Sequence, residues 1–152
     1  MPAVTKVAVV GGGSFGTVMA NIAALNGLPV SIWMRSAELV EGLNASHENE
    51  SYLPGHKLDD RVVATLSMVE AVGDAELIFL AIPSGSFRAV VTEVMKAASS
   101  SAMLVSTTKG IEAGTFKLMS QVLEELAPDS PIGVLSGPNL AKEIAALQLT
   151  GT

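Results

Sequence analysis

A glycine-rich segment near the start of the chain limits the available folds more than any other feature. Gly11, Gly13 and Gly16 form the pattern G-x-G-x-x-G between an apolar stretch at residues 4–10 and a helical pattern at residues 14–26. Gly11 permits a tight turn, Gly13 lets backbone approach a diphosphate, and Gly16 lets helix and strand pack closely. The helix start adds free N–H groups and a positive dipole end. This context predicts a dinucleotide-binding turn; the alternative is a tight turn without a ligand.

The rest of the chain alternates apolar and amphipathic segments. Strands are predicted at residues 4–10, 30–34, 61–65, 77–82, 102–106 and 132–135. Helices are predicted at residues 14–26, 37–45, 86–98 and 115–126 (with Leu118 facing inward), from Ser67 onward, and from Gly137-Pro138 to about residue 146. Ser67 followed by Glu70 is typical of a capping box. Continuous apolar strands separated by helices predict the α/β class, as a Rossmann-like, doubly wound, mainly parallel sheet with helices on both faces.

Composition excludes several classes of protein. The 152 residues are 49% hydrophobic and 16% charged, which is unlike a disordered chain. No cysteine is present, so disulfides, thiolate metal sites and cysteine nucleophiles are excluded. The net charge is −6 and the basic residues are scattered, which argues against nucleic acid and anionic membranes as partners. With no targeting segment and no apolar run of about 20 residues, we expect a cytoplasmic protein without membrane insertion.

The two histidines, His47 and His56, lie in a polar segment at residues 47–60 that is predicted to be a long loop. They do not form a metal-ligand cluster, so no metal site is expected. We expect both to be surface residues of that loop.

Arg35 carries the prediction of cofactor preference. In enzymes that select NAD, an acidic residue about 20 residues after the glycine pattern holds the ribose 2′-hydroxyl. Here Arg35, followed by Ser36, ends the second predicted strand, and Glu38 comes three residues later. Because an arginine can pair with a 2′-phosphate, NADP(H) is preferred over NAD(H), with NAD(H) use left open. The alternative is an ordinary surface arginine.

Loops after three other strands carry further candidates, because ligands of open α/β sheets gather at the carboxyl ends of strands. Pro83 follows the fourth strand, where it either stops the strand or walls the cofactor pocket. Lys109 follows the fifth strand, where it is either a cation in the cleft or a solvated surface residue. The segment Ser136-Gly137-Pro138-Asn139 follows the sixth strand and adds polar groups near a helix start.

These segments resemble the bacterial NAD(P)-dependent glycerol-3-phosphate dehydrogenases. The resemblance rests on GGGSFGT at residues 11–17, WMR at 33–35, NESYLPG at 49–55, TKGIE at 108–112 and SGPNLAKE at 136–143. They occur in the family's order over nearly the whole chain, and the last two together are the most specific.

The resemblance implies reversible hydride transfer between a nicotinamide cofactor and the pair glycerone phosphate and sn-glycerol 3-phosphate, which feeds glycerophospholipid synthesis. It implies cofactor contacts at Ser14, Phe15, Arg35, Lys109 and Ala141, with Ser36 a weaker candidate, and substrate contacts at Lys109, Gly137 and Asn139. Many members carry Ser or Thr in place of Asn139, and Trp or Tyr is common in place of Phe15.

The family also implies a second, α-helical domain that supplies the catalytic lysine. Lys142 does not match that lysine, because the family places it beyond this chain. We therefore expect residues 1–152 to be a dinucleotide-binding domain from a truncated chain, with no catalytic residue and no activity by itself.

Two other hypotheses remain. One is the cofactor domain of another dehydrogenase, of the ketopantoate or 3-hydroxyacyl-CoA type. The other is a non-catalytic nucleotide-sensing module. For a glycerol-3-phosphate dehydrogenase, the expected partner is the small-molecule substrate, glycerone phosphate or sn-glycerol 3-phosphate. Assembly into a homo-oligomer is left open.

Overall fold

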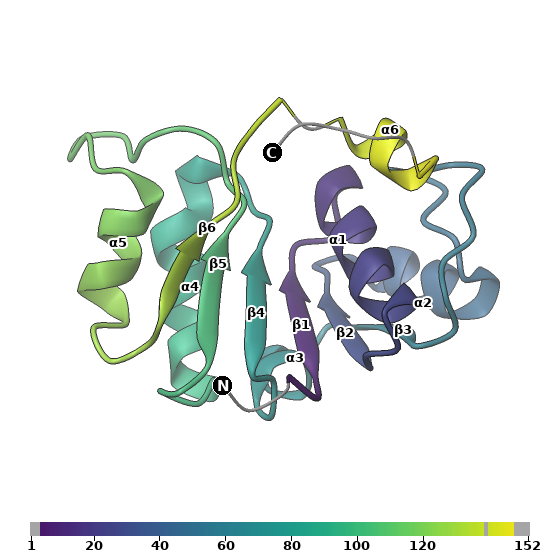
Figure 1. Cartoon of the computed structure of the whole chain (residues 1–152), viewed down its shortest axis with the longest axis horizontal. Coiled ribbons are helices and arrows are strands. Elements are labelled where there is room, and N and C mark those ends of the chain that lie inside the picture. Colours follow the sequence, from purple (N-terminus) through teal and green to yellow (C-terminus); the bar gives the residue numbers. More distant parts are fainter. Residues whose placement is uncertain (1–3, 139, 148–152) are drawn as a thin grey trace.

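Six parallel strands form one sheet in the computed structural model, which describes residues 4–138 and 140–147 (Figure 1). The strand order is β3-β2-β1-β4-β5-β6. The elements, in chain order, are β1 (Val7–Val10), α1 (Ser14–Leu25), β2 (Val30–Trp33), α2 (Ala37–Ser46), β3 (Val62–Thr65), α3 (Met68–Val72), β4 (Leu77–Leu80), a 3₁₀ turn η1 (Ser84–Ser86), α4 (Phe87–Ala97), β5 (Met103–Ser106), α5 (Met119–Leu126), β6 (Ile132–Val134) and α6 (Ala141–Ala145).

The strand order reverses direction between β1 and β4. The chain adds β2 and β3 on one side of β1, then returns to place β4 on the other side. This is the order of a doubly wound dinucleotide fold, so the predicted Rossmann-like class is confirmed. Because the strands are parallel, their carboxyl ends share the upper edge of the sheet in Figure 1. Ligands of such sheets bind at this edge, beside the reversal point.

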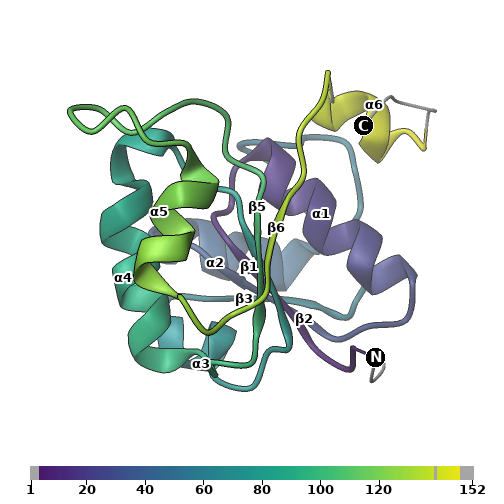
Figure 2. The same cartoon turned by 60° about the vertical axis from the view of Figure 1, so that its left-hand side comes forward.

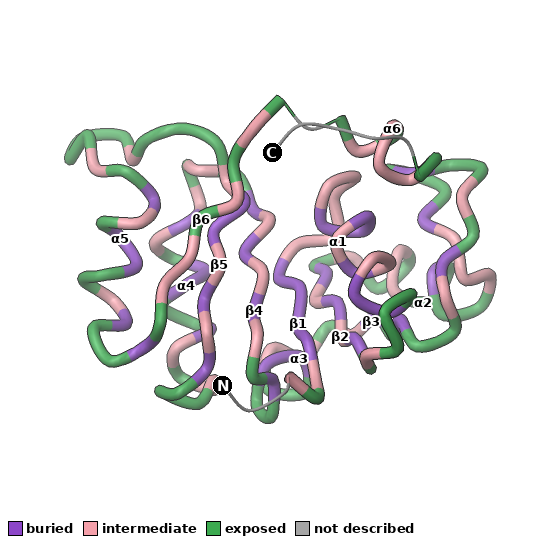
Figure 3. The backbone as a smooth tube through the Cα atoms, in the orientation of Figure 1, coloured by how far each residue is buried: buried purple, intermediate pink, exposed green. Residues whose placement is uncertain are grey.

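Apolar packing covers both faces of the sheet. Val7 and Val9 of β1 pack with α1 and α2, whereas Ala8 and Val10 pack with α3, α4 and α5. Figure 2 shows α4 and α5 on one side of the sheet and α1 on the other. Figure 3 shows β1 buried along its whole length, whereas buried and intermediate residues alternate along β4. The alternation of side chains along a strand explains why every residue of β1 is apolar.

Several strands are shorter than predicted. β1 begins at Val7 instead of residue 4. Before it, the Thr5 hydroxyl donates to the Glu76 carboxylate at 2.9 Å, so this segment is held by a side-chain contact. β4 ends at Leu80 instead of residue 82. Beyond it, the carbonyl of Ile82 bonds to the Thr108 hydroxyl at 2.7 Å, which replaces the sheet ladder.

The helix predicted at residues 115–126 begins only at Met119. Before it, Glu112 N–H donates to the Lys117 carbonyl at 2.8 Å, and Phe116 adopts a positive φ of 58°. The segment cannot become helical without losing this hydrogen bond and changing the φ of Phe116. Leu118 is therefore the N-cap and is 55% exposed, so its prediction as an inward-facing residue was wrong.

Two other helix starts also differ from the prediction. Gly137-Pro138 lies outside the last helix, α6, which begins at Ala141. The helix starts late because its N-cap, Leu140, has an extended backbone, with φ −103° and ψ 120°. Ser67 caps α3 as predicted, by accepting from Glu70 N–H at 3.3 Å. The Glu70 carboxylate instead accepts from the Thr65 hydroxyl at 2.7 Å, so the predicted capping box is only half formed.

Within the described ranges, no helix is long and apolar enough to cross a membrane.

Replacing Leu104 tests the packing of the α4–α5 face. This β5 residue is fully buried, so Leu104→Ala is expected to lower the free energy of unfolding by about 2–5 kcal/mol. Val63 is 54% exposed on the edge strand β3, so Val63→Ala should cost less than about 1 kcal/mol. Urea unfolding followed by circular dichroism measures both. An equal decrease in the free energy of unfolding in the two variants would contradict the burial of Leu104.

Candidate functional site

A cleft of about 510 Å³ opens at the carboxyl ends of β1, β2 and β4. It lies at the point where the strand order reverses. Its lining consists of the glycine turn and the start of α1, the end of β2 and the first turn of α2, the end of β4, and one residue of the loop after α2. These residues are Gly11, Gly12, Gly13, Ser14, Phe15, Gly16, Trp33, Met34, Arg35, Ser36, Leu39, Tyr52, Ala81, Ile82 and Pro83.

The three glycines of the pattern occupy different surroundings. Gly11 has a positive φ of 114°, and a Cβ there would lie 2.2 Å from the Ala81 carbonyl oxygen. A Cβ on Gly16 would lie 2.0 Å from the Gly11 carbonyl oxygen. These two positions therefore need glycine for the fold itself. A Cβ on Gly13 would meet nothing within 4 Å, so its open side is free for a ligand.

The first backbone N–H groups of helix α1 have no acceptor within the helix. Its first intrahelical bond runs from Thr17 N–H to the Gly13 carbonyl at 2.9 Å. The N–H groups of Ser14, Phe15 and Gly16 precede that bond and have no intrahelical partner. The N-cap is Gly13, and the first turn holds no acidic residue. The helix start is therefore open to an anion.

The hydroxyl of Ser14 is engaged in the protein. It donates to the carbonyl oxygen of Tyr52 at 2.6 Å. The donor that Ser14 presents to the cleft is therefore its backbone N–H, and its hydroxyl oxygen remains an acceptor.

Arg35 lies at the rim of the first cleft, after β2. Its guanidinium carbon is 5.8 Å from the centre of the Trp33 ring, within the range of a cation–π contact. Among the described residues it has no ion-pair partner, so its charge is available to a ligand. Ser36 caps α2, accepting from Leu39 N–H at 3.3 Å.

A second cleft of about 340 Å³ continues from the first. The two share Ser14, Phe15, Ala81, Ile82 and Pro83, so one groove runs along the upper edge of the sheet. The further lining residues come from the loops after β5 and β6 and from the start of α6. They are Thr107, Thr108, Lys109, Leu135, Ser136, Gly137, Leu140 and Ala141.

Two threonines fix the loop that carries Lys109. The Thr107 hydroxyl donates to the Leu80 carbonyl at 3.1 Å, and the Thr108 hydroxyl donates to the Ile82 carbonyl at 2.7 Å. These bonds tie the end of β5 to the end of β4. They set the starting direction of the loop from which the exposed Lys109 projects.

An ion pair fixes the other end of the same loop. Arg88 of α4 donates two hydrogen bonds to the Glu112 carboxylate, at 2.6 and 2.9 Å. The Arg88 guanidinium, with a smaller contribution from the Thr115 hydroxyl, lowers the pKa of Glu112 from 4.5 to about 2. Glu112 therefore stays charged and anchored at neutral pH, and it acts on the site only through the loop.

The groove is cationic although the chain carries a net charge of −6. Among its described lining residues, the charged ones are Arg35 and Lys109, and both are positive. An acidic protein repels anions in general, so two unopposed cations in one groove make a selective place for a multiply charged anion.

Comparison with known proteins identifies the family. Residues 6–152 match the family model described as the N-terminus of NAD-dependent glycerol-3-phosphate dehydrogenase. The chain belongs to this family.

Relatives of this glycerol-3-phosphate dehydrogenase family agree with the match. The chain is 53% identical over 152 residues to a protein of Ectopseudomonas mendocina named glycerol-3-phosphate dehydrogenase (NAD(P)+), covering all of this chain and 44% of that protein. It is 49% identical over 147 residues to a protein of the same name from Teredinibacter turnerae, covering 97% of this chain and 43% of that protein. The chain thus spans less than half of these relatives.

A solved glycerol-3-phosphate dehydrogenase shares the fold. The crystal structure of the enzyme from Coxiella burnetii aligns with a TM-score of 0.87 at 28% identity. The alignment covers 93% of this chain and 43% of that one.

The structure gathers the residues predicted for the site of this glycerol-3-phosphate dehydrogenase family member. The first cleft contains Gly11, Gly13, Ser14, Phe15, Gly16, Arg35, Ser36 and Pro83, and the second contains Lys109, Gly137 and Ala141. Asn139 lies outside the described residues. His47 and His56 are half-buried and are not among the described residues that line either cleft.

Sequence reasoning missed several lining residues. Tyr52 was not predicted to be a site residue, but it is 48% exposed and lines the first cleft, whereas its neighbour Leu53 is buried. Its place in the NESYLPG segment was the one available signal. Met34 lies beneath Gly12, where a Cβ would come within 2.4 Å of its Cε. No sequence signal pointed to that contact.

Removing the Arg88 guanidinium tests its hold on Glu112. Because the folded-state pKa lies below 4.5, the ion pair stabilises the fold fully above that pH and is lost as the pH falls toward about 2. Arg88→Gln should return the pKa of Glu112 toward 4.5. The free energy of unfolding should then fall less steeply as the pH is lowered from 4.5 to about 2. Carbon-13 NMR of the carboxyl groups and urea unfolding between pH 2 and 7 measure the two effects.

Arg61→Gln is the matched control, because it breaks the separate Arg61–Asp59 pair, whose N–O distance is 2.9 Å. It should leave the pKa of Glu112 unchanged. An unaltered Glu112 titration in Arg88→Gln would contradict the anchoring role.

Proposed function

We propose that this chain is the dinucleotide-binding domain, residues 1–152, of an NAD(P)-dependent glycerol-3-phosphate dehydrogenase. The full protein would interconvert glycerone phosphate and sn-glycerol 3-phosphate by hydride transfer, and its product would feed glycerophospholipid synthesis. The observation that carries the proposal is the groove at the strand reversal point. Its described charges are all positive, and its floor is a glycine turn with free helix N–H groups.

The first cleft suits the adenosine and diphosphate part of the cofactor. Ser14, Phe15 and Gly16 would donate backbone N–H groups to the diphosphate, and the open side of Gly13 would admit it. Arg35, held against Trp33, would pair with a ribose 2′-phosphate and so favour NADP(H) over NAD(H). Ser36 is a weaker contact because its hydroxyl already caps α2.

The second cleft suits the nicotinamide and the substrate. Phe15 and Pro83 lie in both clefts and would wall the nicotinamide, with Ala141 at the cofactor. Lys109 would attract both the cofactor and the anionic substrate, and Gly137 and Asn139 would contact the substrate.

A bound nicotinamide would accept a hydride from C2 of glycerol 3-phosphate or return one to the carbonyl carbon of glycerone phosphate. The hydroxyl proton needs a separate general base in one direction and the matching acid in the other. We propose that this group is a lysine outside residues 1–152, in the part of the protein that the longer relatives contain. This chain would then bind and orient the cofactor without turning over substrate.

A cytoplasmic location and a homo-oligomeric assembly remain predictions from the sequence. Family membership favours the proposed function over a ketopantoate or 3-hydroxyacyl-CoA dehydrogenase and over a non-catalytic sensor.

Titration of the chain with NADPH and NADH, followed by fluorescence, tests the proposed function. Tighter binding of NADPH is expected, and Arg35→Ala should remove the difference by weakening NADPH about tenfold or more while leaving NADH nearly unchanged. Arg61→Ala, which removes another exposed arginine, should change neither affinity. Binding of neither cofactor would contradict the proposed function, whereas equal affinities would remove only the role of Arg35.

A methyl group at Gly13 tests the position of the diphosphate. Gly13→Ala should fold normally, since its φ of −72° suits alanine and no atom lies within 4 Å of the new Cβ. It should weaken NADPH and NADH alike, by about tenfold or more, if the diphosphate lies against this residue. Gly42→Ala adds the same methyl group to α2 in open space and should leave both affinities unchanged. Unchanged binding in Gly13→Ala would place the diphosphate elsewhere.

A further inference from the structure

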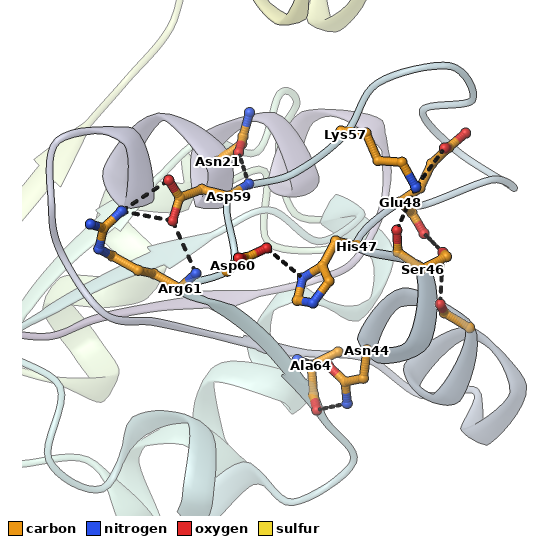
Figure 4. A network of polar contacts seen from close by, with 11 residues as sticks. Asn21, Asn44, Ser46, His47, Glu48, Lys57, Asp59, Asp60, Arg61 and Ala64 are labelled. Carbon is orange, nitrogen blue, oxygen red and sulfur yellow. Dashed lines mark hydrogen bonds and ion pairs between the residues drawn. The ribbon is translucent and has the colours of Figure 1, made fainter.

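The loop between α2 and β3 is closed at its base, as Figure 4 shows in part. Leu58 N–H donates to the His47 carbonyl at 2.7 Å, and Lys57 Nζ donates to the Ser46 carbonyl at 2.7 Å. Asp59 N–H is held by the side chain of Asn21 of α1 at 2.8 Å. The segment at residues 48–57 is therefore a compact loop with a fixed base.

The loop reaches the glycine turn through Asn49, which lies just beyond the base. Asn49 is 3% exposed. Its Nδ2 donates to the Gly12 carbonyl at 2.9 Å and to the Thr17 hydroxyl oxygen at 2.8 Å. Its Oδ1 accepts from Tyr52 N–H at 3.3 Å. One side chain thus joins the glycine turn, helix α1 and the loop.

The contact with Gly12 determines where the next donor points. In a trans peptide the carbonyl and the N–H point in opposite directions, and the chain has no cis peptide bond among its described residues. When Asn49 holds the Gly12 carbonyl, the N–H of Gly13 points away from Asn49. Gly13 lines the first cleft and has open space on its Cβ side.

The glycine turn cannot fix this peptide by itself. Residues 11–13 are three glycines, which restrict their backbone angles less than any other residue. A Cβ at Gly12 would come within 2.4 Å of the Met34 side chain, so any other residue there requires Met34 to move. A contact from outside the turn can therefore select the orientation, and among the described side chains Asn49 holds the Gly12 carbonyl.

We propose that Asn49 is a positioning residue for cofactor binding, which holds the Gly12–Gly13 peptide so that Gly13 N–H faces the cofactor diphosphate. This inference rests on the proposed function and deepens it. The diphosphate is common to NAD(H) and NADP(H). Loss of Asn49 should therefore weaken both cofactors equally, unlike loss of Arg35, which should change their ratio.

The decisive variant is Asn49→Asp, which keeps the shape of the side chain but replaces its donor by an oxygen that faces the Gly12 carbonyl. The dissociation constants of NADH and NADPH should both rise about tenfold or more. Adenosine 2′-monophosphate, which lacks the diphosphate, should bind as it does to the unaltered chain. Asn49→Ala should show the same pattern.

Asn44→Asp is the matched control. Asn44 also bridges backbone groups, since its Nδ2 donates to the Ala64 carbonyl at 2.9 Å and its Oδ1 accepts from Ala64 N–H at 2.7 Å (Figure 4). Its contacts lie on β3, away from the glycine turn. This control should lower the melting temperature without changing the affinity for either cofactor.

A second measurement uses the unaltered chain and so does not depend on how the variants fold. Addition of NADH should shift the amide proton resonance of Gly13 downfield in a proton–nitrogen spectrum, as expected for a donor to phosphate. No shift, unchanged affinity in Asn49→Asp, or equal weakening in Asn44→Asp would overturn the role of Asn49. An unaltered chain that binds neither cofactor would overturn the proposed function and this inference with it.

Discussion

The close approach of three backbone segments where β1 becomes α1 is the constraint on which the groove depends. A Cβ on Gly16 would lie 2.0 Å from the Gly11 carbonyl, and one on Gly11 would lie 2.2 Å from the Ala81 carbonyl. Only hydrogen at both positions lets strand β1, helix α1 and the end of β4 meet so closely. That approach leaves the free N–H groups of α1 at the floor of the first cleft, beside the reversal of strand order.

Polar contacts from distant segments then shape the groove around this floor. Asn49 ties the loop after α2 to the glycine turn, and Thr108 ties the end of β5 to the end of β4. Arg88 holds Glu112 at the far end of the loop that carries Lys109. Asn49 is buried, so removing it should cost more than removing a surface contact, because its partners would be left without a hydrogen bond. Of the side chains that hold the groove, Thr107 and Thr108 also line it, whereas Asn49, Arg88 and Glu112 are not among its described lining residues.

The distribution of charge gives the groove its preference for an anion. Nine basic residues are spread over an acidic chain, and most of the ion pairs that the structure describes occupy the other surfaces. Arg35 and Lys109 are left to face the groove from the ends of β2 and β5. Because Arg35 and Lys109 lie apart along the sheet edge, they could contact opposite ends of a long ligand. Such spacing suits an extended dinucleotide with a substrate beyond it.

The sequence by itself determined the class of fold and the place of the groove, because the period of apolar residues and the glycine spacing are local properties that need no knowledge of distant neighbours. It also located Arg35 and Lys109, since strand ends are visible as the limits of apolar runs. Only the tertiary structure decided the start of α5 after the Glu112 turn, the exposure of Tyr52 and the contact from Asn49 to Gly12. The contacts of Asn49 and Tyr52 depend on hydrogen bonds between residues far apart in the chain, whose partners become neighbours only in the folded protein. The start of α5 depends on a local turn, from Glu112 to Lys117, which the apolar pattern of the sequence does not reveal.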